Sequence, residues 1–120
     1  MPLLKWDETE VLACLEVDPE IDKDGISHSY YVCRGTIHLH LTIFQYDSSV
    51  HVTVKSEDQD NPIIDFKLMS CAGIQYHKEA YSEYLLFAPS DVVGEYYKND
   101  YVVESGFKIS VNPSIAVSIF

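Results

Sequence analysis

The sequence is poor in basic residues and in glycine. Eight Lys and Arg stand against 19 Asp and Glu in 120 residues, which gives a formal net charge of −11 and a pI near 4.6. Proteins that bind nucleic acids by neutralising phosphates need clustered Lys and Arg, so this charge balance disfavours that mode of binding. With only five glycines, Gly-rich loops that cradle phosphates are also scarce. We therefore expect no nucleic-acid partner bound by direct charge neutralisation.

The sequence also has no long hydrophobic run and no cysteine pair. A membrane helix needs about 18 apolar residues and the core of a signal peptide about 7–15, and no segment supplies either. The three cysteines, Cys14, Cys33 and Cys71, are odd in number and far apart, whereas secreted disulfide-rich domains have an even and denser set. We expect all three in apolar surroundings, as small hydrophobic side chains. These features predict a soluble cytoplasmic protein that does not bind membranes.

Hydrophobic residues, by contrast, are plentiful, at 47% of the chain. Disordered chains lack the apolar surface needed to offset the entropy of ordering, so this content predicts a folded protein. Domains usually have roughly 100–200 residues, so a chain of this length is expected to form one. A folded domain of this size buries roughly two-thirds of the surface that its unfolded chain exposes. We expect a single domain over residues 1–120.

The dominant pattern is an alternation of apolar and polar residues, which is typical of strands with one buried face. Regular or less regular segments of this kind cover residues 29–34, 37–44, 50–55, 64–68, 84–87, 107–111 and 115–119. Short strands at such close spacing predict an all-β domain. We expect an antiparallel β-sandwich or barrel-like meander of about 7–9 short strands, with at most one or two short helical turns.

Two segments fit more than one structure. Residues 7–17 carry a capping-box pattern, Asp7 with Glu10 three positions later, which suits a helix. They also carry apolar residues at every second position, and we favour a strand, because the residues that follow resemble a connection into the next strand. Residues 90–98 are compatible with a short helix capped by Ser90.

A candidate metal site lies on the hairpin that the alternation predicts. His38 and His40 are two positions apart on one strand and so share a face, and imidazole pairs of this kind bind Zn, Cu, Ni or Fe. A two-residue loop over 48–49 would pair residues whose numbers sum to 97. Glu57 then lies opposite His40, whereas His51 lies about 20 Å along the strand. The alternative hypothesis is therefore a β-barrel that binds a metal or small ligand through His38, His40 and Glu57.

Other catalytic or cation-binding patterns are incomplete. Cys71 precedes His77 and Glu79, but acidic surroundings raise a thiol pKa and oppose its activation as a nucleophile. We expect Cys71 to be a buried residue at a strand end. Residues 20–25 match the first half of a calcium-binding loop, yet Tyr31 stands where the bidentate Glu belongs, so we interpret them as a turn. We expect a non-enzymatic protein without a cofactor.

The negative charge is concentrated in three segments. Residues 1–25 hold eight acids and two bases, residues 57–62 three acids and no base, and residues 91–104 four acids and one base. The last segment also contains three of the nine tyrosines, and tyrosine is enriched at binding hot spots. The alternative is that the acids are simply solvated and the rings cover the core. The candidate partner-binding residues are Asp91, Glu95, Tyr96, Tyr97, Asp100 and Tyr101.

From these features we expect a small acidic protein-binding module: an inhibitor, an immunity-type protein or a subunit of a complex. Its acidic, tyrosine-bearing loops would engage a partner protein with a basic surface, because opposite charges speed the encounter of two proteins. Self-association into a homo-oligomer through an exposed edge strand is a third hypothesis.

Overall fold

The computed structural model of the chain describes residues 4–89 and 106–120. In chain order its elements are α1 (Glu8–Leu15), β1 (Glu20–Ile21), β2 (Ser27–Arg34), β3 (Ile37–Phe44), β4 (Ser49–Ser56), β5 (Ile64–Leu68), β6 (Cys71–Lys78), β7 (Glu83–Pro89), β8 (Phe107–Ser110) and β9 (Ala116–Ile119). All of the paired strands run antiparallel, which confirms the predicted all-β class. The short helix expected at 90–98 lies outside the described residues.

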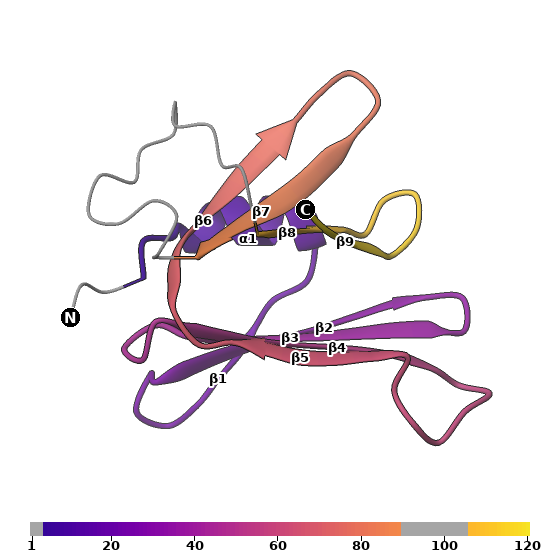
Figure 1. Ribbon diagram of the computed structural model, residues 1–120, viewed down its shortest axis with the longest axis horizontal. Coiled ribbons are helices and arrows are strands. Elements are labelled where there is room, and N and C mark those ends of the chain that lie inside the picture. Colours follow the sequence, from indigo (N-terminus) through magenta and orange to yellow (C-terminus); the bar gives the residue numbers. More distant parts are fainter. Residues whose placement is uncertain (1–3, 90–105) are drawn as a thin grey trace.

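The strands form two sheets, in the orders β1-β2-β3-β4-β5 and β6-β7-β8-β9. Neighbours in each sheet are also neighbours in sequence, so each sheet is a meander. Figure 1 shows the sheets as two layers, with the chain passing from β5 in the lower layer directly into β6 in the upper one. Within the described residues the sheets stay open and do not close into a barrel, so the sandwich is the correct one of the two predicted architectures.

The core fills the space between the two sheets. Phe66 of the first sheet meets Phe107 of the second edge to face, with ring centroids 4.9 Å apart. Phe107 also stacks on Phe87, at 4.4 Å. The Nε of Arg34, at the end of β2, donates a hydrogen bond to the carbonyl oxygen of Val111 at 3.0 Å. Aromatic packing between β5 and β8 and this hydrogen bond to the residue after β8 thus hold the layers together.

Residues Glu8–Leu15 form a helix, so the predicted strand over 7–17 is wrong. Asp7 caps the helix, because its side chain accepts a hydrogen bond from the backbone N–H of Thr9 at 2.8 Å. Glu16 ends it in a left-handed conformation, with φ of 61° and its N–H bonded to the carbonyl oxygen of Leu12. The capping signal in the sequence was therefore the correct one.

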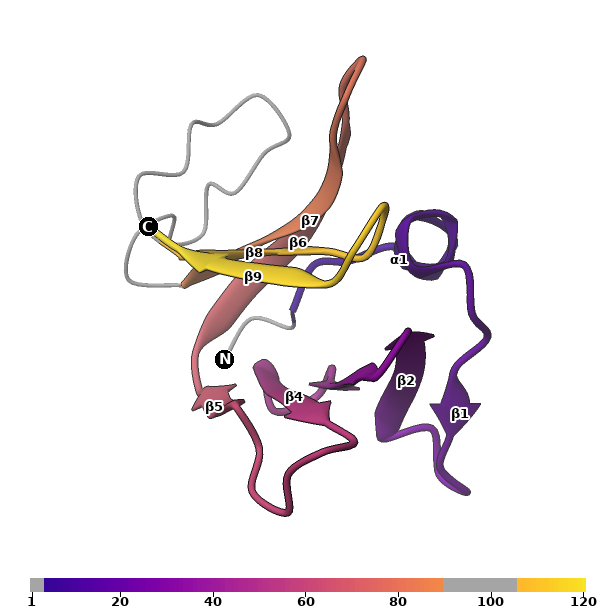
Figure 2. The ribbon, with the colours of Figure 1, turned by 90° about the vertical axis from the view of Figure 1, so that its right-hand side faces the viewer.

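Burial follows the helical period and not the strand period. Val11, Cys14 and Leu15 are buried, whereas Ala13 is exposed. Residues spaced three and four apart share one face of a helix, and this face packs against β6 and β7. Figure 2 shows α1 end-on at one side of the second sheet, with the chain descending from it to β1. No helix in the described part of the chain is long and apolar enough to cross a membrane.

The β3–β4 hairpin has a different register from the predicted one. Its pairs sum to 93, since Phe44 pairs with Ser49 across a four-residue loop over 45–48. The parity of the pairs is unchanged, so apolar residues still face apolar residues. The polar pairs, however, move by four positions, and His38 lies opposite Lys55.

Contacts from outside the hairpin hold its longer loop. The side chain of Gln45 accepts a hydrogen bond from the indole of Trp6 at 3.3 Å and donates one to the carbonyl oxygen of Gly25 at 3.1 Å. The N–H of Cys71 donates to the carbonyl oxygen of Ser48 at 2.7 Å, and Ser48 is left-handed with φ of 53°. These partners are distant in sequence, so local turn preferences alone could not set this register.

Candidate functional site

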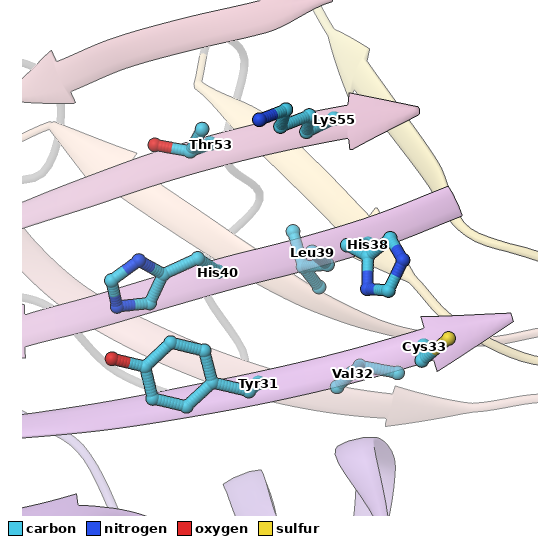
Figure 3. Close-up of a pocket in the computed structure, with 8 residues that line it drawn as sticks. All are labelled: Tyr31, Val32, Cys33, His38, Leu39, His40, Thr53 and Lys55. Atoms are coloured by element: carbon cyan, nitrogen blue, oxygen red, sulfur yellow. The ribbon is translucent and has the colours of Figure 1, made fainter. Parts of the chain in front are cut away.

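The solvent-facing side of the first sheet carries the residues predicted for a metal site. Val32 and Leu39 point into the core, each 1% exposed, so their neighbours on the strands point outward. Figure 3 shows these outward side chains in front of the strands, with Val32 and Leu39 behind them. A hollow on this face is lined by Tyr31, Val32, Cys33, His38, Leu39, His40, Thr53 and Lys55.

Strand register arranges these side chains in two rows. Cross-strand partners lie side by side, and rows two residues apart on a strand are separated by about 7 Å. The first row is Cys33, His38 and Lys55, and the second is Tyr31, His40 and Thr53. His38 and His40 therefore stand in different rows, each with its own neighbours.

His40 is held by the second row and by Thr42. Its ring stacks on that of Tyr31, with centroids 4.2 Å apart and 19° between the planes. Its Nε2 lies 3.0 Å from the hydroxyl of Thr42. Partial burial lowers the pKa of His40, and the nearby His51 lowers it further, whereas Glu20 acts in the opposite direction. Together these surroundings favour the neutral form of the His40 ring over the charged one.

Two predicted positions on this face are wrong because the register differs. Glu57 does not lie opposite His40, whose partner on β4 is Thr53. His51 is not remote from His40: it pairs with Thr42, two positions further along β3. The structure therefore places His51 near His40 and separates His40 from Glu57.

The structure brings His38 and Glu57 together and adds Cys33 to them. The Nε2 of His38 lies 2.9 Å from the Oε1 of Glu57, and both side chains are about half exposed, at 46% and 54%. The donor atoms of Cys33, His38 and Glu57 all lie within 4.8 Å of one another. We call this group the donor cluster. Soft sulfur, imidazole nitrogen and carboxylate oxygen together are a ligand set that suits zinc.

The sequence also contains a turn signal that places Cys33 beside His38, and the predicted site omitted it. Gly35 and Thr36 form a two-residue turn, with Gly35 at φ of 62°, so residues of β2 and β3 pair where their numbers sum to 71. That register puts Cys33 directly opposite His38.

Cys33 also corrects the expectation that all three cysteines lie in apolar surroundings. It is exposed, whereas Cys14 and Cys71 are buried, and burial raises the pKa of both of those thiols to about 12. Cys71 is the first residue of β6 and 1% exposed, which confirms the prediction of a buried residue at a strand end.

A second surface depression lies between α1, β1 and β2. Its lining residues are Glu8, Thr9, Leu12, Asp18, Pro19, Ile21 and Tyr30. The apolar side chains of Leu12 and Ile21 are exposed to 40% and 52%, and Glu8 and Asp18 place carboxylates beside them. We call this the acidic groove. An apolar lining next to carboxylates matches the aliphatic stem and charged head of a lysine or arginine.

Tyr30 lines the acidic groove as a fully buried residue. Its hydroxyl has no hydrogen-bond partner in the described part of the chain. Burial raises the pKa of Tyr30 to about 12, and the charge of Glu8 adds to this. Glu8 also lies 3.1 Å from the Nε2 of His28, which is 3% exposed. The carboxylate of Glu8 is therefore fixed by the fold as well as facing the groove.

The partner-binding residues predicted from the sequence cannot be placed on either surface. Asp91, Glu95, Tyr96, Tyr97, Asp100 and Tyr101 all lie outside the described residues. The acidic residues of the other two segments are all described, and those of residues 4–25 supply most of the acidic groove, through α1 and the chain from it to β1.

Comparison with known proteins gives one informative likeness. The chain matches no family model, and no curated protein matches its sequence. A solved structure is similar over 100% of this chain and 98% of the other: a chain of a contact-dependent growth inhibition toxin–immunity protein complex from Klebsiella pneumoniae 342, with a TM-score of 0.77 and 14% identity. The two chains share a fold. At this identity the likeness shows the fold alone, and its coverage includes α1 and both sheets.

Proposed function

We propose that this chain is an immunity-type protein: a small non-enzymatic module that binds a toxin domain and blocks its action. The observation that carries the proposal is the end-to-end likeness to a chain of a toxin–immunity protein complex. That complex holds both a toxin and an immunity protein, so the properties of this chain decide which role we assign to it. Its sequence has no complete catalytic constellation, and its net charge of −11 suits a protein that covers a basic surface.

The partner in this proposal is a protein with a basic surface. The acidic groove supports it, because exposed Leu12 and Ile21 beside the carboxylates of Glu8 and Asp18 form a receptor for a lysine or arginine side chain. A charged group that enters such a depression is desolvated on binding, which is where hot spots of interfaces occur. The acidic segment over 91–104 belongs to the same proposal as a second source of attraction for a basic partner.

Co-expression tests the proposal. Each gene next to that of this chain in the source genome is expressed from an inducible promoter, with and without the chain. We expect one product to arrest growth, co-expression of this chain to restore growth, and the purified pair to form a complex whose association rate falls steeply with added salt. If none of the neighbouring products both arrests growth and binds the chain, the proposal fails.

A further inference from the structure

The donor cluster joins three consecutive parts of the first sheet at one end. Cys33 comes from the end of β2, His38 from the start of β3, and Glu57 from the residue after β4. Cys33 and His38 are direct cross-strand partners, so their side chains leave the sheet side by side on the same face. Among residues 4–89 and 106–120, this is the group of His, Cys, Asp and Glu side chains whose donor atoms converge.

Backbone contacts hold the three donors before any ligand is present. The turn over Gly35 and Thr36 fixes the spacing of Cys33 and His38. The N–H of Glu57 donates to the carbonyl oxygen of Thr36 at 2.9 Å, which ties the third donor to the same turn. A site whose backbone is already ordered loses less conformational entropy on binding, because only the side chains need to be immobilised.

We propose that Cys33, His38 and Glu57 bind one Zn²⁺ ion, with water as the fourth ligand. Donors around a tetrahedral zinc ion lie about 3.4–3.6 Å apart, given bonds of about 2.0–2.3 Å. The largest distance between two donors, up to 4.8 Å, therefore has to contract by about 1.2–1.4 Å, and the 2.9 Å between His38 Nε2 and Glu57 Oε1 has to widen by about 0.5 Å. Exposed side chains can make this adjustment by small rotations.

The charges at the site are consistent with a dication. Zinc binding releases the thiol proton of Cys33, because the thiolate is the form that binds metal. The thiolate and the carboxylate of Glu57 then neutralise the two positive charges of the ion. Lys55 lies beside His38 in the same row, and its positive charge repels a cation. This repulsion is small once the two negative ligands have neutralised the charge of the ion. The bound ion would tie the β2–β3 turn to the start of the β4–β5 loop and stabilise both.

The same sheet contains a matched pair without a sulfur donor. His51 Nε2 lies 2.7 Å from Asp65 Oδ1, and the two side chains are 41% and 52% exposed. Its exposure and geometry resemble those of His38 and Glu57, but it lacks a converging third donor among the described residues. The pair at His51 is therefore the internal control for adventitious binding to an exposed His–carboxylate pair.

Cobalt and zinc titrations of the reduced chain, expressed without a His tag, test the proposal. Co²⁺ bound by a thiolate gives a charge-transfer band in the near ultraviolet, and we expect this band at one equivalent. Cys33→Ser should abolish it. His38→Gln and Glu57→Gln should each weaken Co²⁺ and Zn²⁺ binding by at least about tenfold, which is the effect of losing even an outer-shell partner at many metal sites.

The controls separate a built site from incidental binding. His51→Gln and Asp65→Asn should leave the band and both affinities unchanged, and circular dichroism should show that every variant is folded. Absence of the band in the unmodified chain, its persistence in Cys33→Ser, or equal weakening by His51→Gln and His38→Gln would each overturn the zinc site. None of these outcomes bears on toxin binding, since the measurements use the chain without a partner.

Discussion

Two consecutive tyrosines of β2 show how one strand serves two different surfaces. Tyr30 is fully buried on the inner side, where it lines the acidic groove. Tyr31 is 52% exposed on the outer side, where its ring stacks on His40. The residue type is the same and the positions are adjacent, so the difference comes from strand geometry, in which successive side chains point to opposite faces.

The two surfaces differ in chemistry as well as in position. The acidic groove has carboxylates beside exposed apolar side chains, which suits a basic side chain of a protein. The outer face has imidazoles, hydroxyls and one thiol, which suits a metal ion at the donor cluster. The acidic groove is lined by α1, the segment before β2 and the inward Tyr30, whereas the hollow on the outer face is lined by β2, β3 and β4, so the protein has two separate candidate sites.

Truncating the two tyrosines should give the largest contrast. Tyr30→Ala should lower the free energy of unfolding by about 3–5 kcal/mol, as usual when a large buried aromatic side chain is removed. Tyr31→Ala should lower it by about 1 kcal/mol or less, because only a surface stacking contact is lost. Urea unfolding of both variants measures the difference. Similar losses for both would contradict the opposite burial of these residues.

A second pair of variants compares the acidic groove with another acidic region. Asp18→Lys places a positive charge at the groove, where like-charge repulsion should weaken binding of a basic partner by about tenfold or more. Asp60→Lys makes the same change of charge on the loop between β4 and β5, at the opposite edge of the first sheet, and should weaken binding by about twofold at most. Calorimetric titration with the partner from the co-expression test measures both, and equal effects would remove the groove from the interface.

The segment over 91–104 should act mainly on the rate of encounter. Reversing Asp91, Glu95 and Asp100 to Lys should slow association several-fold and reduce its dependence on salt, because charges at an interface rim steer diffusion more than they hold the complex. Surface plasmon resonance at several salt concentrations measures this. If the association rate is the same with and without the three substitutions, this segment takes no part in attracting the partner.

The alternation of the sequence was sufficient to predict most of the fold. Seven of the eight predicted β segments fall on strands, and the exception is the one over 7–17, which is helical. The alternation is clearest where a strand buries one face, as in β2 and β8. β6 was missed because three consecutive residues in it, 73–75, are buried. Such a run does not alternate between apolar and polar residues. β1 has only two residues, both exposed, and therefore gives no periodic signal.

Two parts of the candidate site were predicted wrongly: the position of Glu57 and the omission of Cys33. Trp6 and Cys71 hold the β3–β4 loop at four residues, and no local pattern encodes that contact. The wrong loop length moved Glu57 opposite His40 in the prediction, although it lies against His38. Cys33 was accessible to the same reasoning, because Gly35 marks a two-residue turn that pairs Cys33 with His38.

The smallest expected effect concerns the charge of the outer face. His40 has a lowered pKa in the folded chain, chiefly because of burial, so the unfolded chain binds its proton more readily. The stability due to neutral His40 is therefore complete above its unfolded pKa of about 6.5 and is lost as the pH falls below that value.

His40→Gln should reduce the change in unfolding free energy over this pH range by less than about 1 kcal/mol, because the ring is only partly buried. Urea unfolding between pH 7.5 and pH 5, within the range of about pH 5–8 over which histidines titrate, compares this variant with the unmodified chain. An unchanged pH profile would show that the outer face leaves His40 as easily charged as a free imidazole.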